Sequence, residues 1–140
     1  MKTIRVLLLA AAACGGSGTT IDTSVLIGIW NGTETLVAGS KSAQGTGSIG
    51  VTANGAELSL GGLCIDSSIL SATAASATEF SIPQQNCPLY ASPTGCSAIT
   101  LGWTTGHGTV ANNVLTITAT GTLAGCGQSL TATFTFNGRK

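Results

Sequence analysis

Residues 130–136 read Leu-Thr-Ala-Thr-Phe-Thr-Phe, so that apolar side chains and threonines alternate without interruption. Side chains of a β-strand point to opposite faces in turn, and the segment therefore predicts a strand with one apolar and one hydroxyl-bearing face. Threonine also favours such a pleated, half-buried surface. The same alternation recurs at residues 58–60, 80–82, 99–103 and 115–120. Together these segments predict an all-β protein of about eight strands.

Short turn sequences lie between the alternating segments. Asn54-Gly55 separates two of them, and Asn-Gly is the strongest short-range indicator of a two-residue hairpin. Residues 112–113 (Asn-Asn) and 125–128 (Gly-Cys-Gly-Gln) predict two further hairpins, because Asn and Gly tolerate the positive φ of tight turns. Residues 67–78, rich in Ala and Ser, could instead hold one short helix. Strands joined in this way predict an antiparallel up-and-down meander, closed as a small barrel or folded as a sandwich.

The composition excludes several classes of protein. Of the 140 residues, 43% are hydrophobic and only 7% are charged, which argues against intrinsic disorder. Lys and Arg number 5 and show no basic run, and aromatic residues make up 4% of the chain, so nucleic-acid binding has no support. The length favours a single domain. We expect it at residues 25–140, after a Gly-, Ser- and Thr-rich tether at residues 14–24.

The first residues have the order of a bacterial export signal. Lys2 and Arg5 precede an apolar run at residues 6–13 that ends at Cys14, and this run is too short to span a membrane. Residues 8–15, Leu-Leu-Ala-Ala-Ala-Ala-Cys-Gly, resemble the lipobox of bacterial lipoproteins, whose signal is cut immediately before a lipid-modified cysteine. One position departs from that pattern, because alanine stands three residues before the cysteine, where the family usually has leucine. The alternative is an ordinary secretory signal peptide in which Cys14 has no role.

The resemblance implies removal of residues 1–13 and attachment of the chain to the membrane through lipid on Cys14. Several acyl chains, palmitate among them, would give a stable anchor where a single chain does not. Gly15 follows the cysteine, whereas the inner-membrane retention residue of the family is Asp, so the resemblance favours the outer membrane in a host that has one. Without the leader, three cations and five anions remain, and the net charge of −2 gives no attraction to anionic lipid.

Five cysteines are an odd number, which a lipid on Cys14 would explain. The other four, Cys64, Cys87, Cys96 and Cys126, can form two disulfides in an oxidising compartment. Four cysteines allow three pairings. Cys87 and Cys96 flank a turn-rich segment, so we expect a Cys87–Cys96 bridge and a Cys64–Cys126 bridge, with the crossed pairing as the alternative.

Patterns that would indicate catalysis or metal binding are weak. Residues 45–50 match G-x-G-x-x-G, but they lead into a strand, whereas a dinucleotide site needs a helix. His107 is the only histidine, no G-x-S-x-G sequence occurs, and the cysteine spacings lack the close pairs of zinc sites. Glu57 and Glu79 alternate with apolar residues and are expected to face outward. We therefore expect no enzyme, metal or cofactor, and place His107 in an exposed loop.

The segment Gly28-Ile29-Trp30 resembles the G-x-W that opens the barrels of lipocalins and avidin-type proteins. In those families the tryptophan closes one barrel end, and a basic residue near the last strand packs on it. The resemblance implies that Arg139 packs on Trp30 through a cation–π contact. The alternative is an ordinary core tryptophan. Glu34 shares the parity of Trp30, so it would face inward and need Lys41, Arg139 or threonine hydroxyls as partners.

Two roles fit these observations. The first is a lipid-anchored extracytoplasmic β domain with a non-enzymatic binding or structural role at the bacterial cell envelope, its protein or other partner unknown. The second is a lipocalin-like carrier of a small apolar ligand in a barrel cavity. In both, Trp30, Glu34 and Arg139 are the candidate ligand or barrel-end residues, and the membrane is reached through Cys14.

Overall fold

The computed structural model of the chain describes residues 20–64, 68–89 and 99–140. Within these ranges it contains nine strands: β1 (Gly28–Ala38), β2 (Lys41–Asn54), β3 (Glu57–Gly61), β4 (Leu70–Ala74), β5 (Glu79–Ile82), β6 (Gln85–Leu89), β7 (Ile99–Ala111), β8 (Val114–Gly125) and β9 (Gln128–Arg139). None of the described residues belongs to a helix long and apolar enough to cross a membrane. The all-β prediction is confirmed.

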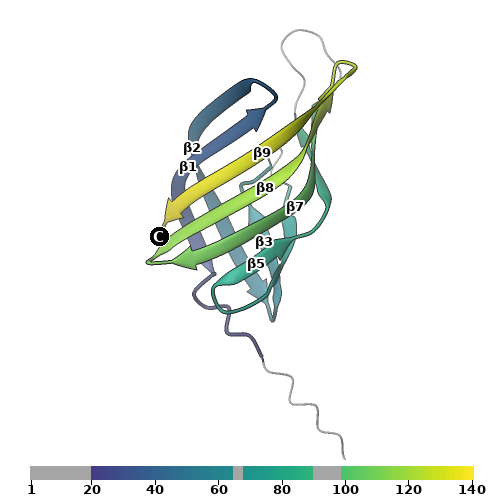
Figure 1. Cartoon of the computed structure of the whole chain (residues 1–140). Helices are drawn as coiled ribbons and strands as arrows, with labels where there is room; N and C mark the ends of the chain where they lie inside the picture. Colours follow the sequence, from purple (N-terminus) through teal and green to yellow (C-terminus); the bar gives the residue numbers. More distant parts are fainter. Residues whose placement is uncertain (1–19, 65–67, 90–98) are drawn as a thin grey trace, which may run out of the picture.

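Eight of the strands close into an antiparallel barrel (Figure 1). β1 to β5 pair in sequence order, β5 pairs with β7, and β7, β8 and β9 lead back to β1. β6 is an additional strand on the same edge of β7: β5 pairs with residues 106–109 and β6 with residues 99–103. The predicted up-and-down meander is confirmed, and it forms a barrel.

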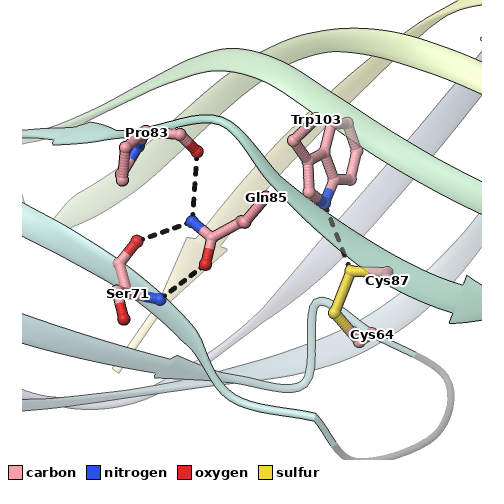
Figure 2. The surroundings of a disulfide bond; sticks show 6 residues. All are labelled: Cys64, Ser71, Pro83, Gln85, Cys87 and Trp103. Carbon is pink, nitrogen blue, oxygen red and sulfur yellow. Dashed lines mark hydrogen bonds between the residues drawn. A yellow bond between two sulfur atoms is a disulfide. The ribbon is translucent and has the colours of Figure 1, made fainter.

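Pro83 and Gln84 separate β5 from β6, and a side chain maintains the connection across this break. Proline has no N–H to offer a neighbouring strand. The backbone N–H of Ser71 in β4 donates to Oε1 of Gln85 at 2.9 Å, and Nε2 of Gln85 donates to the Ser71 carbonyl at 2.8 Å (Figure 2). The same Nε2 donates to the Pro83 carbonyl at 3.2 Å. A side-chain amide thus links β4 to β6 where the backbone pairing of β4 with β5 ends.

The tight turns follow from backbone φ. Residues 112–113 have φ of 51° and 59°, and residues 126–127 have φ of 53° and 73°. Two consecutive positive values define the type I′ turn that suits the twist of a hairpin, so both predicted hairpins are confirmed. The remaining predicted hairpin is shifted by one residue. Asn54 is the last residue of β2, and the turn consists of Gly55, with φ of 65°, and Ala56.

The core consists of the inward side chains of the alternating strands. β9 shows the predicted pattern from residue 131 onward: Ala132, Phe134 and Phe136 are buried, and Thr131 and Thr133 are exposed, whereas Leu130 of the same apolar face is 40% exposed. β4 alternates in the same way, so the short helix considered for residues 67–78 is wrong. Other strands contribute large buried side chains: Trp30, Ile49, Leu60, Phe80, Trp103, Leu115 and Ile117.

One cross-strand pair depends on the absence of a side chain. Phe80 in β5 lies directly opposite Gly108 in β7. A Cβ at Gly108 would overlap the Phe80 ring. The glycine therefore leaves the space that the phenyl ring fills, a recurrent arrangement in β-sheets.

Candidate functional site

One end of the barrel is closed by the segment that precedes β1. Residues 20–27 turn across this end, where the N–H groups of Leu26 and Ile27 donate to the Thr23 carbonyl at 2.9 and 3.3 Å. Leu26 is 0% exposed and Trp30 is 1% exposed. The indole N–H of Trp30 donates to the Leu26 carbonyl at 3.0 Å, which fixes the segment to the barrel wall. A pocket of about 330 Å³ remains at this end, and its lining consists of Val25, Trp30, Val110, Asn113 and Lys140.

A local hydrogen bond holds the first turn of residues 20–27. The backbone N–H of Ser24 donates to Oδ1 of Asp22 at 3.0 Å. Hydrogen bonding to Ser24 lowers the pKa of the Asp22 carboxyl, because it favours the charged form. The carboxylate thus stabilises the turn that leads to Leu26.

The cation on Trp30 is Lys140, so the expected contact of Arg139 is wrong. Nζ of Lys140 lies 4.5 Å from the centroid of the Trp30 ring and donates to the Val25 carbonyl at 2.9 Å. Arg139 is exposed and pairs with Asn31 of β1. Alternation explains the difference: inward positions of β9 are even-numbered, so residue 140 continues the inward face and residue 139 lies on the outer one.

The opposite end holds a pocket of about 300 Å³ between β1, β2, β7, β9 and the segment after β3. We call it the mouth pocket. Its apolar lining consists of Leu36, Leu63, Leu101, Trp103 and Phe134. The remaining lining residues are Glu34, Ala43, Gln44, Gly45 and Gly62. A mainly apolar cavity with few polar groups is typical of small-molecule sites, and this volume is at the lower end of their range.

The deep wall of the mouth pocket is held in place by aromatic and sulfur contacts. Trp103 is 2% exposed, and its indole N–H donates to Sγ of Cys87 at 3.3 Å. Its ring meets Phe134 edge to face, with centroids 5.6 Å apart. Cys87 is bonded to Cys64, so Trp103 lies beside a covalent link between β6 and the segment after β3 (Figure 2). These contacts form the wall without a ligand.

The Cys64–Cys87 disulfide shows that the expected pairing of Cys64 with Cys126 and Cys87 with Cys96 is wrong. Because residues 85–89 form a strand on β7, Cys87 is 0% exposed and faces Cys64 inside the barrel. Cys126 is also in a disulfide. Cys96 and Cys14 lie outside the described residues, as do residues 1–13 and the first part of the tether.

Glu34 is half-buried in the mouth pocket, on the inward face of β1. Its carboxylate lies along the neighbouring strand: Oε2 is 2.8 Å from the position of a Cβ on Gly47, and Oε1 is 3.7 Å from that of a Cβ on Gly45. The two glycines of β2 therefore make room for it. Among the described residues, no hydrogen bond or ion pair reaches this carboxylate, so the predicted partners Lys41 and Arg139 do not hold it.

The remaining candidate groups lie on the outer surface. His107 is exposed, opposite Ser81 and Thr118 in the middle of β7, so its placement in a loop was wrong. Glu57 and Glu79 are exposed, as their alternation predicted. In the described parts of the chain, no group of three or more His, Cys, Asp and Glu residues could hold a metal ion.

Sequence reasoning missed most of the mouth pocket. Trp103 belongs to an alternating segment, which indicated that it faces inward but not that it borders a cavity. Leu63 and Gln44 lie outside the alternating segments of the sequence. Only their position beside Glu34 in the closed barrel brings them into the site.

Comparison with known proteins gives distant similarities. No family model and no curated protein matches the chain. A candidate outer membrane protein from Bacteroides fragilis NCTC 9343 is 18% identical with a TM-score of 0.48 over 88% of this chain and 54% of that one. The chain thus spans about half the length of that protein. A redesigned β-barrel is 16% identical with a TM-score of 0.40 over 89% of this chain and 99% of the other.

Proposed function

We propose that this protein is a non-enzymatic binding domain of the bacterial cell envelope, held there by lipid on Cys14, that takes a small and mainly apolar ligand into the mouth pocket. The observation that carries the proposal is the pocket of about 300 Å³ with its five large apolar lining residues. The proposal joins the envelope role and the carrier role in one molecule.

The difference between the barrel ends supports a binding role. At the closed end the inward side chains of Leu26 and Trp30 are already buried, although Val25 and Ile27 of the same segment are exposed. In the mouth pocket Leu36 and Leu63 are only partly buried. A ligand that covers them removes apolar surface from water, at about 25 cal/mol for each Å². A wall formed in advance also lowers the entropy lost on binding.

The position of the tether agrees with this role. Residues 20–27 lie at the closed end, opposite the turn between β1 and β2 (Figure 1). An anchor that precedes them holds the closed end toward the membrane. The mouth pocket then faces away from the anchor, toward the compartment from which a ligand would come.

Tryptophan fluorescence tests the binding role, because the two tryptophans report on opposite ends. The experiment uses Cys14→Ser protein, which carries no lipid and needs no detergent. In this background Trp30→Phe leaves Trp103 as the reporter and Trp103→Phe leaves Trp30. We expect 1-octanol to change the Trp103 signal saturably and to leave the Trp30 signal unchanged. A flat Trp103 response to alcohols of several lengths, with circular dichroism showing a folded protein, would contradict ligand binding.

Intact mass tests the anchor separately. Protein extracted from its own membranes should have a chain mass that begins at Cys14 and carries acyl groups. The Cys14→Ser variant should be found free of the membrane. An unlipidated wild-type chain cut at another site would contradict the anchor and leave the binding role in place.

A further inference from the structure

Among the described residues that line the mouth pocket, Glu34 is the one that carries a charge. It lies among apolar neighbours from β1, β7 and β9, Leu36, Leu101 and Phe134, while the glycines opposite it present no side chain. A charge with few polar neighbours is less well solvated than one on the open surface. The site therefore favours a ligand group that compensates the Glu34 carboxylate for its lost hydration.

The domain itself supplies no cation that pairs with the Glu34 carboxylate. From residue 20 onward the sequence contains three cations, Lys41, Arg139 and Lys140. Lys140 binds Trp30 and Val25 at the closed end, and Arg139 is exposed on the outer face of β9. Lys41 is exposed at the β1–β2 turn, opposite Ala38, and forms no ion pair with Glu34.

On the basis of the proposed binding role, we propose that the mouth pocket is selective for cationic amphiphiles. The positive group of such a ligand would lie at the Glu34 carboxylate, and its apolar chain would pack against Leu36, Leu101 and Phe134. Attraction between the charges is stronger here than in bulk water, because the apolar lining lowers the local dielectric constant. An anionic amphiphile of the same chain length is disfavoured by the same carboxylate.

Three probes with the same octyl chain separate charge from apolar contact: octyltrimethylammonium, 1-octanol and octanoate. Their binding is measured in the Cys14→Ser protein and in its Glu34→Gln and Glu57→Gln derivatives. Glu57 is exposed on β3, so its variant makes the same change in net charge away from the pocket. We expect the ammonium probe to bind about tenfold more tightly than octanol in the parent and in Glu57→Gln. Glu34→Gln should abolish this difference.

A second variant tests the position of the carboxylate without removing it. Gly47→Ala places a Cβ within 2.8 Å of the Glu34 oxygen, so the carboxylate must move. We expect the preference for the ammonium probe to fall while octanol binding stays nearly unchanged. High salt should also weaken the preference, because the group is only half-buried.

The outcomes separate this inference from the proposed function. Equal binding of the ammonium probe and octanol in the parent protein overturns the charge selectivity and leaves the binding role. Loss of the preference in Glu57→Gln as well overturns the assignment to Glu34, since overall charge would then explain it. Binding of none of the three probes overturns both proposals.

Discussion

The closed and open ends of the barrel are built from the same strands, yet they differ in what covers their inward side chains. On β1, Trp30 is 1% exposed under Leu26 and Lys140, whereas Glu34 is half-buried two inward positions along the strand. The alternation of β1 is the same at both points. Burial at a barrel end is therefore set by the segment that crosses it and not by the strand pattern alone.

The two ends of the barrel also differ in how completely their strands pair. β2 pairs with β1 through residues 41–51, but with β3 only through residues 50–54. In the described structure residues 41–49 thus have one partner strand, and residues 41–46 are all exposed. The Cys64–Cys87 disulfide, next to this incomplete part of the wall, supplies a covalent link between elements that do not pair. A wall that is incompletely paired at one end of the barrel can border a pocket while the core in the other half stays packed.

The largest expected difference concerns one leucine at each end. Leu26→Ala removes a side chain that is 0% exposed, and we expect a loss of about 2–5 kcal/mol in the free energy of unfolding. Leu36→Ala removes a half-buried side chain of the mouth pocket and should cost less than about 1 kcal/mol. Urea unfolding of both variants measures the difference. Equal losses would mean that the two ends are packed alike.

Glycine replacements give the next largest effect. Gly108→Ala forces a Cβ into the Phe80 ring in the closed half, and overpacking of this kind costs about 1–3 kcal/mol. Gly47→Ala displaces only the end of the Glu34 side chain, and we expect less than about 1 kcal/mol. Gly50→Ala is the control, because a Cβ there meets nothing within 4 Å. If Gly108→Ala and the control Gly50→Ala have the same thermal stability, the Phe80 ring moves aside without cost.

The smallest effect is expected at the C-terminal cations. Lys140→Ala removes the cation–π contact with Trp30 and should lower the free energy of unfolding by about 0.5–1 kcal/mol. It should also shift the emission of Trp30. Arg139→Ala has the same charge change on the outer face and should stay within about 0.5 kcal/mol of wild type. A larger loss in the free energy of unfolding for Arg139→Ala than for Lys140→Ala would indicate that Arg139 packs on Trp30.

Local patterns predicted local structure well. Alternation at residues 130–136 predicted the inward and outward faces of β9, because side-chain direction follows directly from the extended backbone. Asn112-Asn113 predicted its hairpin, because both residues adopt positive φ. At the C-terminus the prediction was wrong by one residue. Arg139 was assigned to Trp30, although the period of two assigns that place to the next residue.

The sequence by itself determined the all-β class, the order of strands and most hairpins, since these depend on residues a few positions apart. Only the tertiary structure decided that β9 returns to β1, that Cys64 meets Cys87, and that Glu34 and Trp103 line the same pocket. Many alternating strands present the same local pattern, so any of them can pair with any other. Closure selects one register for all of them at once, and that register fixes which side chains meet across the barrel.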